Sequence, residues 1–91
     1  MTTINKYFAK KEQTATGSWA AVDMGFVAKN VRFILKSGAG PLYIKFENMD
    51  TDVEDVLLDS DNKREEFLNY GCKKVFIKGT GDVRIYSWSN N

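Results

Sequence analysis

Lys73-Lys-Val-Phe-Ile-Lys-Gly-Thr-Gly-Asp-Val-Arg-Ile-Tyr-Ser-Trp88 is the stretch of this chain that decides the fold. It contains two runs rich in Val, Ile, Phe and Tyr around Gly79–Gly81, which is typical of two strands joined by a turn. Aliphatic residues alternate with charged or aromatic ones in both runs, so each strand has one apolar face. The stretch therefore predicts a β-hairpin whose inward face is aliphatic and whose second face carries aromatics beside charges.

The length of the turn sets which residues of the two strands lie opposite each other. A two-residue turn would mix core and solvent residues on one face, which a half-buried sheet avoids. A three-residue loop, Gly79–Gly81, sets Ile77 opposite Val83 and Val75 opposite Ile85, with a left-handed glycine and a bulge. We therefore predict the three-residue loop. On the second face this register pairs Lys78 with Asp82, Phe76 with Arg84 and Lys74 with Tyr86, and it adds Trp88 to that face.

Three earlier stretches predict further strands. Val31–Lys36 and Leu42–Glu47 alternate with a period of two. Gly17–Gly25 also alternates, and its last glycine is expected to break the strand. The first two strands either pair directly or lie in different sheets with the loop crossing between them, and both arrangements stay open. The predicted core rows are Val31, Phe33 and Leu35, and Leu42, Ile44 and Phe46.

The middle of the chain, residues 49–70, fits two kinds of secondary structure. Thr51–Glu54 resembles a helix capping box, and Asn62–Gly71 resembles a helix that ends at a glycine. The alternative places strands at Asp55–Asp59 and Arg64–Leu68. Because strand signals elsewhere recur at about 8–12 residues, we predict strands here and keep one short helix as the alternative.

The predicted fold class is all-β: a small, jelly-roll-like antiparallel β-sandwich formed by residues 17–91. About five to seven short strands cannot bury a core as one flat sheet, whereas two sheets packed face to face can. Residues 1–16 are polar apart from Ile4, Tyr7 and Phe8. We predict that they form an N-terminal arm ordered only by contact with a partner or a neighbouring subunit. A frayed terminus, or a short helix using Ile4 and Phe8, is the alternative.

Composition argues against most kinds of chemical site. The chain has 91 residues, a net charge of +1 and no histidine, which removes Ser-His and Cys-His catalysis and the commonest metal ligand. Cys72 is the one cysteine and cannot form an intramolecular disulfide. The acidic run Asp50–Asp55 lacks the glycine of a calcium loop and predicts a solvated edge. No run reaches the roughly 18 apolar residues of a membrane span. We predict no enzyme activity, cofactor, metal, nucleic-acid partner or membrane partner.

The second face of the predicted sheet is the candidate site. In a monomer such a face should be mostly polar, whereas aromatics with arginine are typical of protein interfaces. The alternative is that these residues pack under the N-terminal arm or a long loop. Trp19, Tyr43, Tyr86 or Trp88 could also stack on sugar rings. The predicted interface residues are Ile34, Tyr43, Phe76, Arg84, Tyr86 and Trp88.

Three stretches, Val22–Ile34, Leu42–Phe46 and Val75–Trp88, resemble the small β-sandwich virion proteins of tailed bacteriophages. The resemblance spans about residues 17–88 and consists of the strand pattern, an Asp-x-Gly-Phe start and an Ile-Lys-Gly-x-Gly segment followed by an aromatic end. It implies a non-enzymatic, homo-oligomeric structural part of the virion, made in the host cytoplasm, and does not choose among the roles of such proteins. Together with the amphipathic second face and the missing catalytic residues, it leads us to predict a capsid decoration or cement subunit. The implied partners are further copies of the chain, a trimer being one option, and the major capsid protein or another virion protein. The alternatives are a tail, neck or spike component, or a carbohydrate- or receptor-binding module.

Overall fold

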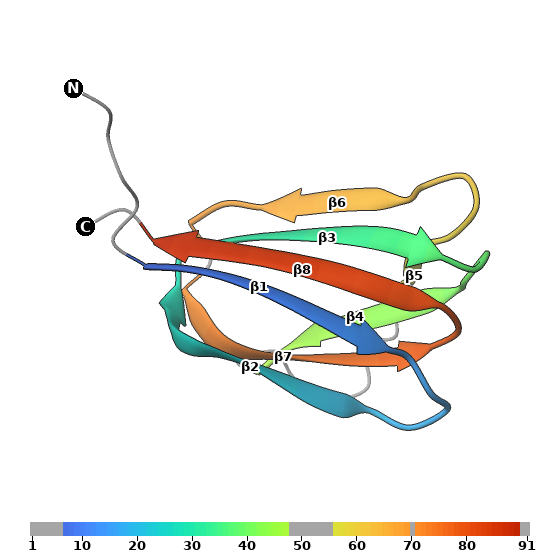
Figure 1. Cartoon of the computed structure of the whole chain (residues 1–91), viewed down its shortest axis with the longest axis horizontal. Coiled ribbons are helices and arrows are strands. Elements are labelled where there is room, and N and C mark those ends of the chain that lie inside the picture. Colours follow the sequence, from blue (N-terminus) through green and yellow to red (C-terminus); the bar gives the residue numbers. More distant parts are fainter. Residues whose placement is uncertain (1–6, 48–55, 70, 90–91) are drawn as a thin grey trace.

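The computed structural model describes residues 7–47, 56–69 and 71–89. These residues form strands and connections, and none of them belongs to a helix that could cross a membrane. The strands are β1 (Tyr7–Thr14), β2 (Ala20–Ala28), β3 (Asn30–Ser37), β4 (Leu42–Phe46), β5 (Val56–Leu58), β6 (Arg64–Phe67), β7 (Cys72–Gly79) and β8 (Asp82–Ser89) (Figure 1).

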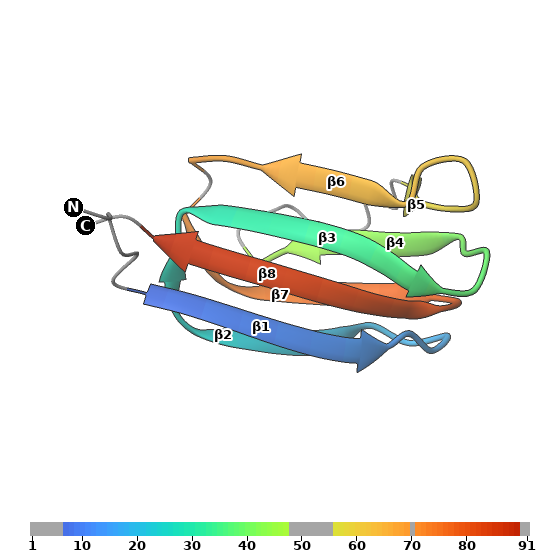
Figure 2. The same cartoon turned by 45° about the horizontal axis from the view of Figure 1, so that its top comes forward.

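The strands form two antiparallel sheets packed face to face, as Figures 1 and 2 show. Sheet A has the order β1-β8-β3-β6, and sheet B has the order β2-β7-β4-β5. The pairing is nested: β1 pairs with β8, β2 with β7, β3 with β6 and β4 with β5. β8 also pairs with β3, and β7 with β4, which completes each sheet. The predicted class, a small antiparallel β-sandwich, is confirmed, and its strand order is that of a jelly roll.

The core lies between the two sheets and is built from the rows that alternation predicts. β3 contributes Val31, Phe33 and Leu35, and β4 contributes Leu42, Ile44 and Phe46, all of them buried. The rings of Phe33, Phe46 and Phe67 meet edge to face, with centroids 5.1–6.1 Å apart. Because these three residues come from β3, β4 and β6, the cluster ties the edge strand β6 to both sheets.

The predicted hairpin around Gly79–Gly81 is wrong, although both of its strands exist. β7 lies in sheet B and β8 in sheet A, so the chain crosses from one sheet to the other. The amide of Thr80 donates to the carbonyl of Pro41 at 3.1 Å, so the connection between β3 and β4 holds this turn. The opposing pairs predicted for the hairpin are not formed: Ile77–Val83, Val75–Ile85, Lys78–Asp82, Phe76–Arg84 and Lys74–Tyr86.

The choice of core residues in these two strands is nevertheless confirmed. Val75, Ile77, Val83 and Ile85 are all fully buried. A hairpin and a crossing connection bury the same alternate residues, since each strand turns one face to the core in both cases. In the structure the two aliphatic rows lie on opposite sides of the core instead of side by side.

The remaining strand predictions have mixed outcomes. The connection between β3 and β4 crosses between the sheets, which is one of the two arrangements left open. Strands β5 and β6 confirm the predicted strands of the middle region. The alternative prediction of a helix over Asn62–Gly71 is wrong for the residues of this range that the structure describes. The capping box at Thr51–Glu54 lies outside the described residues. Gly25 does not end β2: residues 24–27 bulge opposite Lys73, and β2 continues to Ala28.

The prediction of an N-terminal arm is wrong for residues 7–16, the part of the arm that the structure describes. β1 pairs with β8 along its whole length, from Tyr7 opposite Ser89 to Thr14 opposite Asp82. It is therefore an edge strand of sheet A, ordered by this chain's own β8 and not by a partner. The alternative helix that would include Phe8 is wrong for the same reason. Residues 1–6, with Ile4, lie outside the described residues.

Candidate interaction surfaces

The structure divides the six predicted interface residues between two opposite outer faces. They do not share one face because β7 and β8 lie in different sheets. Each of the six is half-buried. Face A, the outer face of sheet A, holds Ile34, Arg84, Tyr86 and Trp88, and face B, the outer face of sheet B, holds Tyr43 and Phe76.

Face A carries an aromatic hollow beside β1. The ring of Phe8 lies 6.1 Å from that of Tyr86, and the Cζ of Arg32 lies 5.7 Å from the ring centre of Trp88. Together these four side chains line an open hollow of about 340 Å³. Phe8 is absent from the predicted interface because residues 1–16 are predicted to form an arm. Its position directly opposite Trp88 in the β1–β8 register brings it into the site.

Ion pairs hold the cations of face A in place. The guanidinium of Arg32 contacts a carboxylate oxygen of Glu66 through Nη2 at 2.6 Å and Nε at 2.7 Å. Glu12 accepts from Lys36 at 3.2 Å and from Arg84 at 3.0 Å, and these hydrogen bonds, that of Lys36 foremost, lower the pKa of Glu12. Exposed pairs of this kind add little stability. They do fix side chains in advance, which lowers the ordering cost of binding a partner.

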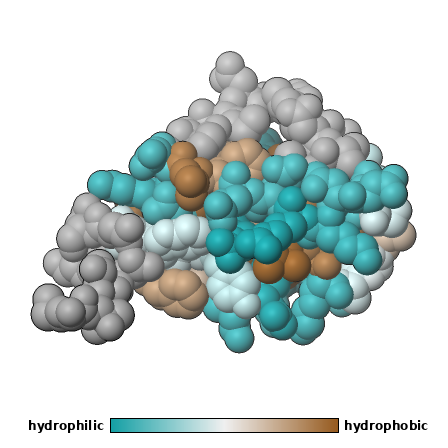
Figure 3. All heavy atoms as spheres, turned by 90° about the horizontal axis from the view of Figure 1, so that it is seen from above, coloured by the Kyte–Doolittle hydropathy of each residue, from teal (hydrophilic) through white to brown (hydrophobic). Residues whose placement is uncertain are grey.

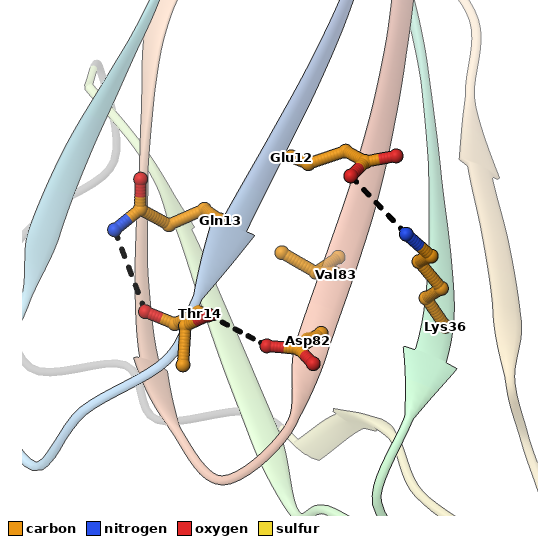
Figure 4. A pocket seen from close by; sticks show the side chains of 6 residues that line it. All are labelled: Glu12, Gln13, Thr14, Lys36, Asp82 and Val83. Atoms are coloured by element: carbon orange, nitrogen blue, oxygen red, sulfur yellow. Dashed lines mark hydrogen bonds and ion pairs between the residues drawn. The ribbon is translucent and has the colours of Figure 1, made fainter.

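A second hollow on the same sheet is lined by polar side chains that bond to one another, and we call it the polar clasp. Asp82 accepts hydrogen bonds of 2.6 Å from the hydroxyls of Thr14 and Ser37, so one carboxylate joins β8 to both neighbouring strands. These bonds, that of Ser37 foremost, lower the pKa of Asp82. Figure 4 shows that the polar groups of this hollow are directed toward one another. It is lined by Glu12, Gln13, Thr14, Lys36, Asp82 and Val83.

Face B combines three aromatic rings with two lysines. The Nζ of Lys45 lies 4.7 Å from the ring centre of Trp19 and 5.4 Å from that of Phe76. The Nζ of Lys78 lies 4.8 Å from Trp19 and 5.9 Å from Tyr43. Two ammonium groups therefore already contact Trp19. A sugar ring would have to displace a lysine in order to stack on this tryptophan.

The structure places Cys72 in the core and brings no metal-binding cluster together among the described residues. Cys72 is buried, and burial raises the pKa of its thiol to about 11, whereas reactive cysteines have a lowered pKa. Within residues 7–47, 56–69 and 71–89, no cluster of three or more His, Cys, Asp or Glu could hold a metal ion. The acidic run Asp50–Asp55 lies outside the described residues.

Comparison with known proteins adds one structural likeness. No protein-family model matches the chain. No curated protein matches it in sequence. Its fold is similar to a chain in a solved structure described as the acidic stable capsid structure of Helicobacter pylori bacteriophage KHP30. The TM-score is 0.49 and the sequence identity 15%, with 97% of this chain and 92% of that chain covered. A likeness with so low a TM-score and sequence identity supports no conclusion about the function of this chain.

Proposed function

We propose that this protein is a non-enzymatic structural component of a phage virion, specifically a capsid decoration or cement subunit. In this role it binds the major capsid protein or another virion protein and associates with further copies of itself. Its location is the virion, after synthesis in the host cytoplasm.

The observation that carries the proposal is the aromatic and arginine surface of face A. Trp, Tyr and Arg dominate the binding energy of protein interfaces, above all where neighbouring groups fix them in place. Trp88 and Tyr86 lie on the central strand β8, and Arg32 is held by Glu66. A rigid sheet that presents such residues suits attachment to another protein better than it suits catalysis.

Two further observations support a virion role. The stretches Val22–Ile34 and Val75–Trp88 resemble small β-sandwich virion proteins of tailed bacteriophages, and they span β2–β3 and β7–β8 of the sandwich with their connections. The jelly-roll order is also a common architecture of viral capsid domains. Lectins and cupins share this architecture, so the fold alone does not choose the role.

The first test is to locate the chain in the virion. Purified virions of the phage that encodes it should contain the chain, detected by mass spectrometry and placed on the capsid by electron microscopy. Absence from virions would contradict the proposal.

The second test uses binding to purified capsids that lack the chain. Trp88→Asp should weaken binding by at least about thirtyfold, since buried interface hot spots contribute about 2 kcal/mol or more. Phe76→Asp is the matched control, because Phe76 is also half-buried but lies on face B. Weak binding of Phe76→Asp together with normal binding of Trp88→Asp would show that face A is not the attachment surface.

A further inference from the structure

Strand β1 buries less of itself than the other edge strands of the sandwich. Among residues 8–14 of β1, no side chain is buried, although β8 buries every second residue along the same register. The other edge strands that the structure describes all reach the core: β2 through Val22, β5 through Leu58 and β6 through Phe67. β1 is therefore the edge strand whose detachment disturbs the core least.

The side-chain contacts that join β1 to sheet A are polar, exposed and specific. Glu12 accepts from Lys36 of β3 and from Arg84 of β8, and the hydroxyl of Thr14 donates to Asp82 at 2.6 Å. Exposed contacts of this kind add little stability, so opening β1 costs less than unfolding the whole domain. Each contact nevertheless matches one residue of β1 to one residue beside it. The edge that β1 covers is thus fitted to the sequence of β1.

The connection between β1 and β2 contains a short hinge. Its first two residues are fixed to the turn between β7 and β8, where the amide of Ala15 donates at 2.9 Å and the carbonyl of Thr16 accepts at 2.8 Å. Gly17 and Ser18 follow and are exposed, and a Cβ on Gly17 would meet no atom within 4 Å. The described residues up to Thr16 can therefore swing as one unit about Gly17 and Ser18.

The surfaces of the sandwich favour exchange of a strand over simple docking of two copies. Docking requires a contiguous apolar patch. Seen from the β6 edge, the described residues are mainly hydrophilic, and their hydrophobic patches are separate (Figure 3). The aromatic surface of face A is the proposed attachment site for the capsid. Strand exchange needs neither surface, because it remakes between two copies the contacts that one copy already makes within itself.

We propose that β1 of one copy leaves its own β8 and pairs with β8 of a second copy, with Gly17 and Ser18 as the hinge. This exchange deepens the self-association part of the proposed function and rests on that part alone. The second copy offers an identical edge, so Glu12 and Thr14 find the same partners there. Reciprocal exchange closes a dimer, and cyclic exchange closes a ring. Copies held side by side on a capsid meet at effective concentrations of about millimolar, which favours exchange.

The first measurement asks whether β1 detaches while the rest of the sandwich stays folded. Hydrogen exchange of the unmodified chain, followed by NMR, reports the opening of each amide. The amides of β1 that bond to β8 should exchange at least about tenfold faster than those of β3 that bond to β8. Low urea should leave the β1 rates unchanged, since a local opening exposes little surface. Equal protection of β1 and β3 would overturn the proposal.

A disulfide between β1 and β8 then shows which copy supplies the strand. Ala9 lies opposite Ser87, so Ala9→Cys with Ser87→Cys places two thiols across this pair, and Cys72→Ala removes the native thiol. The chain is refolded from urea at about 1 mM, where other copies compete with its own strand, and at about 1 μM, where they do not. After oxidation, non-reducing electrophoresis should show covalent oligomers at the higher concentration and monomers at the lower. Circular dichroism confirms folding. Should this pair fail to fold, Lys10→Cys with Tyr86→Cys tests the adjacent position.

A hinge variant of the same cysteine pair is the matched control. Inserting about six Gly and Ser residues between Gly17 and Ser18 leaves both strands unchanged and lets β1 fold back more easily onto its own β8. This variant should give covalent monomers at both concentrations. The proposal is overturned if the unmodified hinge also gives only monomers at the higher concentration, or if the insertion leaves the yield of covalent oligomers unchanged.

Virions separate the failure of the exchange from the failure of the proposed function. Virions whose copies carry the disulfide only within one chain overturn the exchange and leave the virion role standing. Exchanged oligomers of a chain that is absent from virions do the reverse.

Discussion

Gly79→Ala should destabilise the sandwich more than any other glycine substitution compared below. Gly79 has a φ of 127°, and a Cβ there would collide with the carbonyl oxygen of Pro41 and approach the Cα of Leu42 to 3.1 Å. That carbonyl also accepts from Thr80, and the amide of Gly79 itself donates to Thr16 at 2.8 Å. Three chain segments therefore meet at this point, and none can move aside without breaking a hydrogen bond.

The expected magnitude follows from two separate costs. A side chain forced into this backbone conformation costs about 1–3 kcal/mol. Displacing packed backbone to accommodate an extra carbon costs about 1–3 kcal/mol more. The sum, about 2–6 kcal/mol, is a large part of the roughly 5–15 kcal/mol that stabilises a domain of this size. The melting temperature should fall by about 10 °C or more, at roughly 4–8 °C for each kcal/mol.

Two other glycines serve as controls for these two costs. Gly25 has a φ of 87° but open space around it, so Gly25→Ala should lose only the conformational part, about 1–2 kcal/mol. Gly17 has neither a positive φ nor a neighbour within 4 Å, so Gly17→Ala should be neutral or stabilising by up to about 1 kcal/mol. Urea unfolding followed by tryptophan fluorescence measures all three. If Gly79→Ala were no less stable than Gly25→Ala, the close meeting of the three segments would be refuted.

Three further perturbations test other parts of the fold. The Oγ of Ser87 is buried without a hydrogen-bond partner among the described residues, so Ser87→Ala should be neutral or raise the free energy of unfolding by up to about 1 kcal/mol; a clear loss in urea unfolding would show that this hydroxyl is bonded. The pKa of Asp82 is lowered from 3.8, so the stability that it contributes is present above that value and lost as pH falls through its folded pKa. Melting curves between about pH 5 and 2 should therefore depend less on pH for Asp82→Asn than for the unmodified chain, and equal slopes would argue against the clasp with Thr14 and Ser37. Because Cys72 is buried and its thiol has a raised pKa of about 11, it should resist labelling by Ellman's reagent at pH 8 until urea unfolds the protein, and rapid labelling of the native state would contradict its burial.

Alternation predicted which residues enter the core but not which strands become neighbours. Val75, Ile77, Val83 and Ile85 are buried whether β7 and β8 form a hairpin or lie in opposite sheets, so no pattern within the two strands separates these cases. The two cases differ in contacts between segments that are far apart in the chain, such as the hydrogen bond from Thr80 to Pro41 and the pairing of β7 with β2 and β4. The candidate interface was split between two faces for this reason.

Strand β1 is not predicted from the sequence, and the physical reason is a different one. Its register with β8 places Lys11 opposite Ile85 and Gln13 opposite Val83, so two of the residues opposite the buried row of β8 are polar. Edge strands commonly carry inward-pointing charges, which discourage pairing with further chains, and this removes the apolar row by which a strand is recognised. Because β1 is not predicted, the predicted interface does not include Phe8.

The nested pairing of the strands has a consequence for synthesis on the ribosome. β8 lies between β1 and β3, and β7 between β2 and β4, so the central strand of each sheet is made in the last part of the described chain. Until these two strands emerge, β1, β2, β3 and β4 lack their principal partners and expose the sheet edges at which nascent chains aggregate. Closing such distant pairs is also slow, because the entropy of the long loops must be overcome before the contacts form. We therefore expect the two sheets to be completed only after β8 has been synthesised, although the β3–β6 and β4–β5 pairs can form earlier.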